Sequence, residues 1–511
     1  MTVSRRGLLA GTFGIGALAA LAACSTDNPG ASVGNGLPRN GGTLRVGVVG
    51  LATKLQTDPH NLLRNESDML LASLVFDPLT VPGADRPVAP RLAASWTADP
   101  AQRVWTFTIA DKATFHDGSP VRPEDVVWSL QRLRARPGGY WKVPVPLEGI
   151  TVAGPNQVSL APTEPDSQLP LLLRMMTFVL KEGTSGLVTD SPGSGPFVLE
   201  SYHDGNARLR RNPQWYGGAP YLDAIEVVRF DSLQALSSAI DSGQIDLASN
   251  VGAIAARVAA GRKDLAVVRR KNDLAVMLAM QSSTGPFSDP RARQAIRLGI
   301  DRPAMVRAIT SDYGTVGNDI LGAGDPDYGK DFPQRARDVG KAKQLLAEAG
   351  FDTRAAYTIY TKDEAVGEVD SAKLMATQLR DIGLTVDVSV QESTAFYDKY
   401  WKKAPLTTVS WGTNDSLMFY AGKILQTSSS SNETGFHDAE FDQAYLRVLA
   451  NGAGDAQNAA LHDLQRIEYD RGPYLCWGLA DGIDIARPAV HGLPQISGYG
   501  RVQLEKTWLA G

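Results

Sequence analysis

Helix-type and strand-type hydrophobic patterns alternate along the second half of the chain, and this alternation most narrows the possible folds. In residues 339–350 the apolar side chains recur every three or four positions and a glycine ends the pattern, as in an amphipathic helix. Residues 371–383 repeat that pattern, and residues 384–390 then alternate apolar and polar side chains like a half-buried strand. Helix followed by strand, repeated, predicts an α/β fold with helices layered on a sheet.

The other elements are predicted from the same two periods and from turn residues. Strands are predicted at 43–48, 104–109, 225–230, 474–479 and 483–486, with a hairpin within 149–160. Pro123 and Pro290 each mark a helix start, because proline suits the first helical turn. The Gly/Pro-rich stretch 191–202 leads into a strand and is a candidate crossover between lobes.

Size, charge and cysteine content bound the class of protein. The chain has 511 residues and is 43% hydrophobic, enough for a large core and two to four domains. Its formal net charge is −4, so nucleic acid is not an expected partner. Cys476 lies in the apolar segment YLCWGL, where we expect a buried, unreactive thiol and no disulfide. Stability must then come from burial.

The first 24 residues have the features of an export signal. Arg5 and Arg6 precede an uncharged run at 7–20 that is short for a membrane span, and small residues follow at 21–23. The paired arginines suggest the twin-arginine route. Cys24 after Leu-Ala-Ala resembles the bacterial lipobox, in which the cysteine receives lipid and begins the mature chain. An ordinary secretory signal with an incidental cysteine is the alternative.

This interpretation sets the expected location. Residues 1–23 would be a lipoprotein signal peptide, and the Gly-, Pro-, Asn- and Ser-rich residues 24–42 a flexible tether. We therefore expect a protein anchored by lipid on Cys24 at the extracytoplasmic face of a bacterial cell membrane.

The sequence contains no recognisable catalytic or metal-binding motif. Its six histidines are scattered, with no HExxH and no paired His/Cys spacing, and no GxSxG elbow occurs. We therefore expect no catalytic residues, no metal ligands and no cofactor, and a protein that is not an enzyme. A secreted hydrolase remains the alternative, because acidic residues are plentiful enough to supply a carboxylate pair.

Aromatic residues set among Gly, Ser and Asn are the strongest sign of a ligand site. They include Tyr140, Trp141, Trp411 and Phe436. Clefts between domains are lined by such side chains, although core packing is the alternative for each of them. We expect Tyr140 and Trp141 to wall a cleft from the side opposite Trp411.

Nine segments stand in a fixed order along the chain: GGTLRVGV from Gly41, LVFDPLT from Leu74, APRLAASWTAD from Ala89, FHDGSPVRPEDVVWSLQRL from Phe115, SGPFVLESY from Ser194, RNPQWYGGAPYLDAIEV from Arg211, DPRARQAIRLGIDRPAMV from Asp289, AKQLLAEAGF from Ala342 and TGFHDAEFDQ from Thr434. In this order they resemble the family-5 extracytoplasmic solute-binding proteins of ABC importers, the group that includes dipeptide- and oligopeptide-binding proteins. The resemblance covers nearly the whole chain after the tether.

The resemblance implies a two-lobed type-II periplasmic-binding-protein fold with an extra inserted domain. Lobe I would comprise residues 43–80, 190–272 and 480–511, the inserted domain 81–189, and lobe II 273–479. The ligand would be a peptide or another small molecule, and the partner an ABC permease in the membrane. We expect a monomer.

The resemblance also singles out the run Trp411-Gly412-Thr413-Asn414-Asp415. Peptide-binding relatives have a tryptophan followed, after two residues, by an aspartate that pairs with the peptide's ammonium group. Asn414 stands at that position here, and the acid, Asp415, comes one residue later. A charge-assisted bond is worth about 1.5 to 3 kcal/mol and a neutral one about 1 kcal/mol.

Two explanations of this departure remain open. Either Asp415 takes the role of the missing aspartate, or the ligand is not a free-amino peptide. In the second case a nickel chelate, an oligosaccharide, an opine or another small metabolite would be bound instead. A receptor that signals through a partner without transport is a further alternative.

Overall fold

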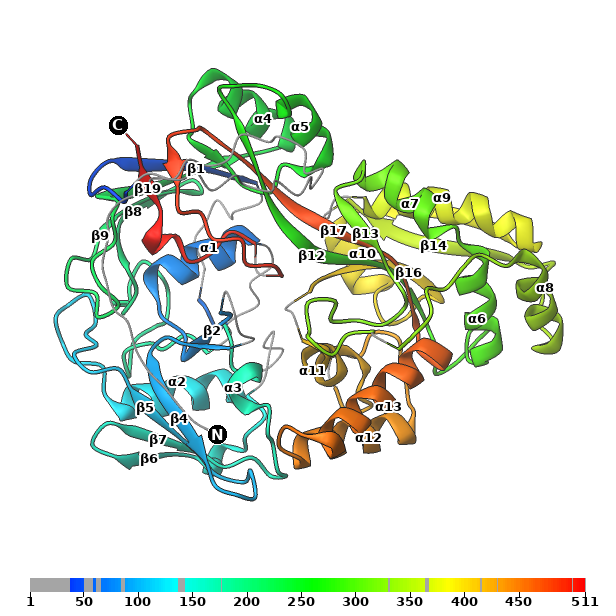
Figure 1. Cartoon of the computed structure of the whole chain (residues 1–511), viewed down its shortest axis with the longest axis horizontal. Helices are drawn as coiled ribbons and strands as arrows, with labels where there is room; N and C mark the ends of the chain where they lie inside the picture. Colours follow the sequence, from blue (N-terminus) through cyan, green and yellow to red (C-terminus); the bar gives the residue numbers. More distant parts are fainter. Residues whose placement is uncertain are drawn as a thin grey trace, which may run out of the picture.

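The computed structural model describes residues 37–49, 58–60, 66–83, 88–136, 143–175, 177–329, 331–363, 367–413, 416–429, 431–498 and 500–510. They form two lobes that lie side by side and a third domain next to the first lobe (Figure 1). Among these residues, eleven strands make one mixed sheet that extends through both lobes, in the order β15-β14-β16-β12-β17-β11-β1-β10-β9-β8, with β13 paired to β17.

Lobe I is the part of the molecule around the first strand of the chain. Its elements are β1 (Thr43–Val49), α1 (Glu66–Val75), β8 (Phe197–His203), β9 (Asn206–Arg211), β10 (Ala224–Phe230), α4 (Leu233–Ser242), β11 (Leu247–Ala248), α5 (Gly252–Ala259), β18 (Val490–His491) and β19 (Trp508–Leu509). Strand β1 lies between β10 and β11 and runs parallel to both. The alternating apolar side chains predicted for β1 are buried, Leu44 and Val46 completely.

The inserted domain has its own small sheet, made of four antiparallel strands in the order β4-β5-β7-β6. Its elements are β3 (Ala89–Pro90), β4 (Ala93–Ala98), β5 (Trp105–Ile109), α2 (Pro123–Ala135), β6 (Ile150–Gly154), β7 (Gln157–Leu160) and α3 (Leu169–Leu172), and β2 (Thr80–Val81) pairs with β3 at its border. Helix α2 begins at Pro123, as the sequence predicts, and the Asp125 side chain accepts from the backbone N–H of Arg122.

Lobe II carries most of the helices. Its elements are α6 (Pro290–Gly299), α7 (Arg302–Met305), β13 (Gly314–Val316), α8 (Val339–Glu348), β14 (Ala356–Lys362), α9 (Glu368–Leu379), β15 (Thr385–Gln391), α10 (Ser393–Lys399), β16 (Leu406–Gly412), α11 (Leu417–Tyr420), α12 (Ala439–Ala450) and α13 (Asp455–Arg471). Asp289 and Asp301 cap α6 and α7, because each carboxylate accepts from a backbone N–H of the first turn. The predicted alternation of helix and strand is confirmed here.

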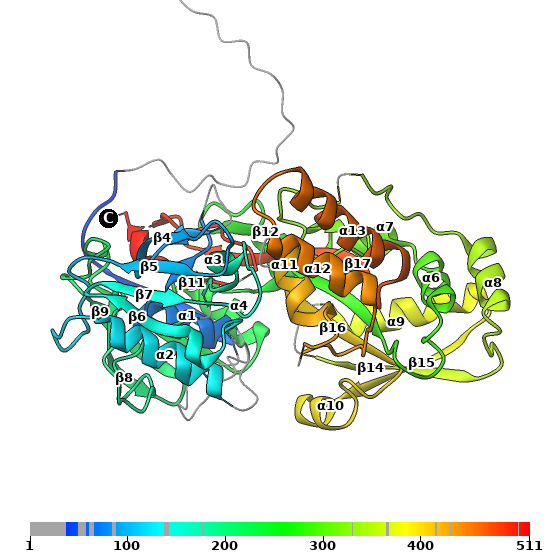
Figure 2. The ribbon, with the colours of Figure 1, turned by 90° about the horizontal axis from the view of Figure 1, so that it is seen from below.

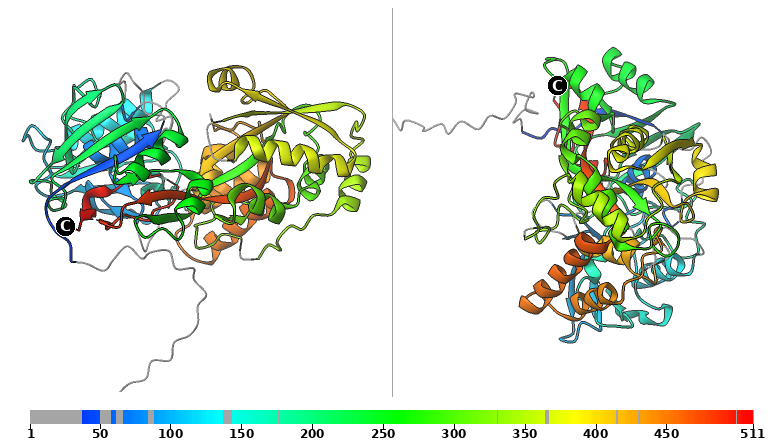
Figure 3. Two further views of the ribbon diagram at one scale, coloured as in Figure 1. Left: turned by 90° about the horizontal axis from the view of Figure 1, so that it is seen from above. Right: turned by 90° about the vertical axis from the view of Figure 1, so that its right-hand side faces the viewer.

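Two long antiparallel strands connect the lobes, β12 (Ala266–Met280) and β17 (Tyr474–Ala486). They run from one half of the molecule to the other (Figure 3, left). The sequence predicted two separate strands at 474–479 and 483–486, but the structure has one continuous strand. The stretch 191–202 leads into a strand, β8, as predicted, but it joins the inserted domain to the edge of lobe I and is not a crossover between the two lobes. The predicted lobe boundaries at 272/273 and 479/480 fall inside the two connecting strands.

The inserted domain touches lobe II as well as lobe I. The backbone N–H of Ser167 donates to the carbonyl of Leu449 at 2.8 Å, and its hydroxyl donates to the carbonyl of Val448 at 3.1 Å. The side chain of Gln457 donates to the Ser167 hydroxyl at 2.9 Å. One hydrophobic cluster therefore includes side chains from both the inserted domain and the α11–α13 region. Figure 2 shows α12 beside the inserted domain. We call Ser167, Val448, Leu449 and Gln457 the inserted-domain contact.

Cys476 lies on β17 and is completely buried, as the sequence predicts, and its thiol is free. Burial raises the pKa of this thiol to about 12, which disfavours the reactive thiolate form. Among the described residues, no helix is long and apolar enough to cross a membrane. Cys24 and the predicted signal and tether up to residue 36 lie outside the described residues.

Candidate ligand site

The parallel strands of lobe II end at the side of that lobe that faces lobe I. Strand β14 runs parallel to β15 and to β16, so the carboxyl ends of the three strands lie at one edge of the sheet. Helix α10 follows β15 directly and lies on the side of lobe II nearest lobe I in Figures 2 and 3. In open α/β sheets, ligands bind outside the carboxyl ends of the strands, at the point where the strand order reverses.

Trp411 lies at this edge and close to the connection between the lobes. It is opposite Ala275 of β12 in the strand pairing, and the next pair is Gly412 with Leu274. The register of β12 against β17 shifts between Arg270 and Leu274, so the connection bulges directly after this pair. Trp411 is half-buried. It is therefore the predicted ligand residue that the structure places at the junction of the lobes.

A buried carboxylate holds the Trp411 ring. The indole Nε1 of Trp411 donates to Oε1 of Glu433 at 3.0 Å, and the hydroxyl of Tyr474 donates to the same oxygen at 3.0 Å. The indole Nε1 of Trp401 donates to the other oxygen, Oε2. Glu433 is only 5% exposed. Burial raises the pKa of its carboxyl above the ordinary value, and the three donors act in the opposite direction.

Beside this carboxylate lies a buried ion pair at the end of β14. Nζ of Lys362 is 3.0 Å from both carboxylate oxygens of Glu368, and the hydroxyl of Ser410 donates to Glu368 at 2.9 Å. The Lys362 ammonium also lies 4.9 Å from the ring centroid of Phe396 on α10. These bonds tie α9, α10 and β16 to the carboxyl end of β14.

Aromatic rings from α10 and the following turn extend the same surface. Tyr397 is 45% exposed and forms an edge contact with Trp401, with ring centroids 5.7 Å apart. Tyr400 stacks on Tyr360 of β14 at 4.1 Å. The ammonium of Lys402 lies 4.2 Å from the ring centroid of Trp401. The edge thus presents half-buried aromatic rings, the type of surface that lines ligand sites.

Two lysines, Lys402 and Lys423, lie in this region, and burial disfavours the charged form of both. Burial lowers the pKa of Lys402, and burial together with the Lys402 charge lowers the pKa of Lys423 to about 7. Lys423 belongs to the π-helical turn Ala421–Leu425 that follows α11. This region therefore combines the buried carboxylate beside Trp411 with the Lys402 ammonium over Trp401, whereas Lys423 is only partly charged near neutral pH.

The connection between the lobes is held by a buried ion cluster. Arg270 of β12 contacts Asp484 of β17 at 2.6 Å and Asp273 at 2.9 Å, and Arg501 from the C-terminal segment pairs with the same Asp484. All four side chains are nearly or completely buried. Asp273 also accepts from the backbone N–H of Gly498 at 2.5 Å. These bonds fix the C-terminal segment to the two connecting strands.

The outcome for the other predicted site residues is mixed. Tyr140, Trp141, Asn414 and Asp415 lie outside the described residues, so their roles stay predictions. Phe436 is 3% exposed and packs edge-on against Phe441, with ring centroids 5.8 Å apart. It belongs to the hydrophobic cluster shared with the inserted domain, and a direct ligand contact by Phe436 stays a prediction as well.

Sequence reasoning missed Glu433 as part of the site and gave Trp401 no separate role in it. Glu433 lies in the loop sequence Ser431-Asn432-Glu433-Thr434, which gives no sign of burial. Its three donors come from segments up to 41 residues away. A clustering of indoles near Trp411 was the only available signal.

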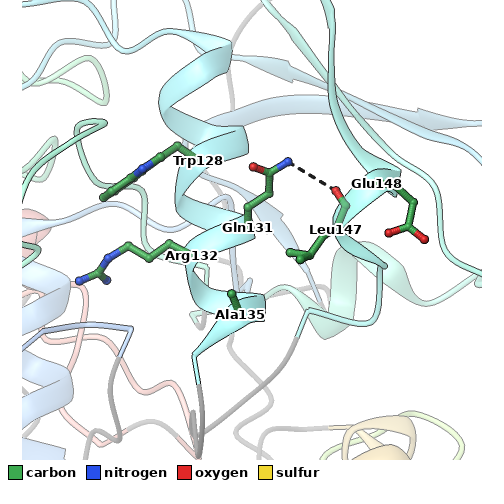
Figure 4. Close-up of a pocket in the computed structure, with 6 residues that line it drawn as sticks. All are labelled: Trp128, Gln131, Arg132, Ala135, Leu147 and Glu148. Carbon is green, nitrogen blue, oxygen red and sulfur yellow. Dashed lines mark hydrogen bonds between the residues drawn. The ribbon is translucent and has the colours of Figure 1, made fainter.

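A separate open cavity of about 530 Å³ lies on the inserted domain (Figure 4). Its lining residues are Trp128, Gln131, Arg132, Ala135, Leu147 and Glu148. The guanidinium of Arg132 binds both carboxylate oxygens of Asp58, at 3.0 and 2.6 Å, so its charge is already paired. None of the lining residues is a predicted ligand residue or belongs to lobe II.

Among the described residues, no group of three or more His, Cys, Asp or Glu side chains is arranged to hold a metal ion.

Known structures with this arrangement define the fold. The oligopeptide-binding protein AppA from Bacillus subtilis, solved in complex with a nonapeptide, has 20% sequence identity and a TM-score of 0.79, covering 93% of this chain and 100% of that chain. The fold is therefore that of two-lobed periplasmic binding proteins, with a large mixed sheet. The predicted fold class is confirmed.

The chain matches the model of bacterial extracellular solute-binding proteins, family 5 middle, over residues 87–433. This chain belongs to that family of solute-binding proteins. It is 22% identical over 462 residues to the probable di/tripeptide-binding protein 5 of Pseudomonas aeruginosa strain UCBPP-PA14, covering 81% of this chain and 86% of the relative. It is also 22% identical over 472 residues to the nickel-binding periplasmic protein of Escherichia coli strain K12, covering 86% and 89%.

Proposed function

We propose that this protein captures a peptide outside the cell membrane and delivers it to an ABC permease. The observation that carries the proposal is the position of Trp411 beside the two strands that connect the lobes, with its ring directed by Glu433. A half-buried indole at that place contacts a ligand enclosed between the lobes. The similarity to a di/tripeptide-binding protein and to a nonapeptide-bound protein supports a peptide as ligand.

The mechanism follows from the connection between the lobes. Open and closed arrangements of two such lobes differ by a few kcal/mol, and a ligand that contacts both lobes stabilises the closed one. A bound peptide lies extended, with its main chain hydrogen-bonded to the protein and its side chains in roomy, hydrated pockets. Binding is stoichiometric and no bond in the peptide is broken.

The membrane anchor is part of the same proposal. Lipid on Cys24 holds the monomeric protein at the extracytoplasmic surface. The tether is the part of residues 24–42 before Gly41, because the backbone N–H of Gly41 already donates to the carbonyl of Tyr221 in lobe I. The anchor keeps the receptor close to the permease and raises its effective concentration there.

Native mass spectrometry of a Cys24→Ser protein, as purified, tests the ligand class directly. We expect one retained peptide per chain, which is exchanged for added di-, tri- or pentapeptides and returned intact. Turnover of the added peptides would support a secreted hydrolase. Deletion of the ABC permease that this receptor serves should abolish uptake of the peptide by the cell. Unchanged peptide uptake would contradict delivery of the peptide to that permease.

A nickel chelate is the second candidate, supported by the similarity to the nickel-binding periplasmic protein. The same experiment with NiCl₂, in the presence and absence of free histidine, distinguishes the two. A retained nickel complex together with no peptide exchange would replace the peptide proposal by this one.

A further inference from the structure

Glu433 is the point at which three hydrogen-bond donors from three different segments meet. Trp401 follows α10, Trp411 is on β16 and Tyr474 begins β17. Their donors reach both oxygens of a carboxylate that is 5% exposed. A buried carboxylate without donors is strongly unfavourable, so these bonds stabilise its presence in the core of lobe II.

The arrangement determines more than the burial of one acid. An indole N–H has a single donor direction, and a bond to a charged acceptor is about twice as strong as a neutral one. Because Trp411 and Trp401 donate to different oxygens of one rigid carboxylate, their two rings are fixed relative to each other. The Trp411 ring therefore has one orientation at the edge where the lobes meet.

Apart from the bonds to Glu433, the two indoles make ring and packing contacts, which restrain the direction of a ring less than a hydrogen bond does. Trp401 has an edge contact with Tyr397 and a lysine ammonium over its face, and Tyr397 is 45% exposed. Trp411 is half-buried at the edge of the shared hydrophobic cluster. Glu433 is thus the shared hydrogen-bond acceptor that restrains the direction of both rings.

We propose that Glu433 is a positioning residue of the ligand site, whose carboxylate holds the Trp411 indole in the orientation that the ligand meets. This inference rests on the proposed function, in which Trp411 contacts the ligand. Glu433 itself does not touch the ligand, because the two indoles and the Tyr474 phenol surround it. Its effect on binding therefore passes through Trp411.

The experiment uses Glu433→Gln, which keeps the size of the side chain and removes its charge. In ligand-free protein labelled with ¹⁵N, we expect the indole N–H resonances of Trp411 and Trp401 to move upfield while those of Trp96 and Trp105 in the inserted domain stay unchanged. The control is Asp125→Asn, a buried acid on α2 of the inserted domain that accepts from the backbone N–H of Arg122 and should leave the Trp411 and Trp401 resonances in place. Unchanged Trp411 and Trp401 resonances in Glu433→Gln would overturn the inference.

The affinity for a peptide gives a second test, which distinguishes a role of Glu433 in positioning Trp411 from a role in stability alone. With the tripeptide Ala-Ala-Ala as probe, Glu433→Gln should weaken binding by about tenfold or more, near the lower end of the effect expected for a lost bond to a charged group. In a Trp411→Phe background the same substitution should change Kd less than about twofold, since no indole remains to be positioned. A full effect in that background would overturn the inference.

Two further outcomes separate this inference from the proposed function. If native protein does not bind Ala-Ala-Ala while the indole resonances shift as expected, the peptide function fails and the positioning role stands. If Glu433→Gln does not fold, Tyr474→Phe replaces it, because it removes the donor that shares Oε1 with Trp411. We then expect the Trp411 resonance alone to shift, and no shift would overturn the inference.

Discussion

Asp484 of β17 and Arg270 of β12 contact each other at 2.6 Å with both side chains completely buried, at the place where the chain passes between the lobes. Buried ion pairs stabilise a fold only when their remaining polar groups are also bonded. Here Asp273 and Arg501 complete a cluster of two cations and two anions. The connection between the lobes is therefore specific in geometry and sensitive to the loss of either charge.

Replacement of Arg270 by Met should lower the free energy of unfolding by about 3 kcal/mol or more, because two buried carboxylates lose a partner. Chemical denaturation monitored by circular dichroism measures the change. The matched control is Arg291→Met, whose pair with Asp289 is largely exposed and should change stability by less than about 0.5 kcal/mol. Equal losses in the two variants would contradict a special role for the cluster.

Asp166, next to the inserted-domain contact, should make stability depend on pH. Burial raises the pKa of its carboxyl from 3.8 to about 6, only partly offset by the bond from the backbone of Gln168. Between about pH 4 and pH 6, the folded protein then binds more protons than the unfolded chain. The contribution of Asp166 is therefore complete below about pH 4 and lost as pH rises through about 6.

Denaturation of native protein and Asp166→Asn at pH 4.5 and 7.5 measures this contribution. We expect the native protein to lose roughly 2 kcal/mol more than the variant over this interval, since one pKa unit corresponds to about 1.4 kcal/mol. The asparagine oxygen can still accept from Gln168. Parallel pH dependence of the two proteins would show that Asp166 does not titrate in this way.

Replacement of Asp415 by Ala should weaken binding of a free-amino peptide at least tenfold, about 1.4 kcal/mol, if that acid pairs with the ammonium group. Asn414→Ala is the adjacent control and should have a smaller effect. Titration calorimetry with Ala-Ala-Ala and its N-acetylated form measures both. An unchanged dissociation constant in Asp415→Ala would leave this carboxylate without a role in peptide binding.

Replacement of Cys24 by Ser should move the protein from the membrane to the soluble fraction, because no acceptor for the lipid remains. Cell fractionation with metabolic labelling by an alkyne fatty acid measures both location and lipidation. A Cys476→Ser variant serves as the control and should remain labelled. Persistence of a labelled, membrane-bound Cys24→Ser protein would contradict the anchor.

Local patterns predicted much of the fold. The aspartates that cap α6 and α7 and the alternating side chains of β1 are visible in the sequence, because each depends on neighbours within a few residues. The length of β17 was not predictable, since Asp481 and Gly482 look like a break. In the structure a Cβ at Gly482 would lie 2.2 Å from Asp273 and 2.4 Å from Arg270, so the glycine makes room for the ion cluster.

The site was less accessible to sequence reasoning than the fold. Trp411 was found because it stands in a run that resembles a family motif. Glu433 was missed because its meaning depends on three donors from distant segments, and nothing in its neighbourhood predicts burial. The three donors meet at Glu433 only after the chain has folded, so the residues next to Glu433 in the sequence could not indicate its role.

The inserted-domain contact joins the two halves of the molecule at a second place. The strands β12 and β17 connect the lobes at one side, and the bonds from Ser167 to the carbonyls of Val448 and Leu449 connect the inserted domain to lobe II at the other. A relative rotation of the lobes that preserves the connecting strands must either break the Ser167 bonds or carry the inserted domain along with lobe II. Whether the inserted domain moves with lobe I or with lobe II therefore depends on the bonds of Ser167 to the carbonyls of Val448 and Leu449 and to the side chain of Gln457. None of these residues belongs to the connecting strands.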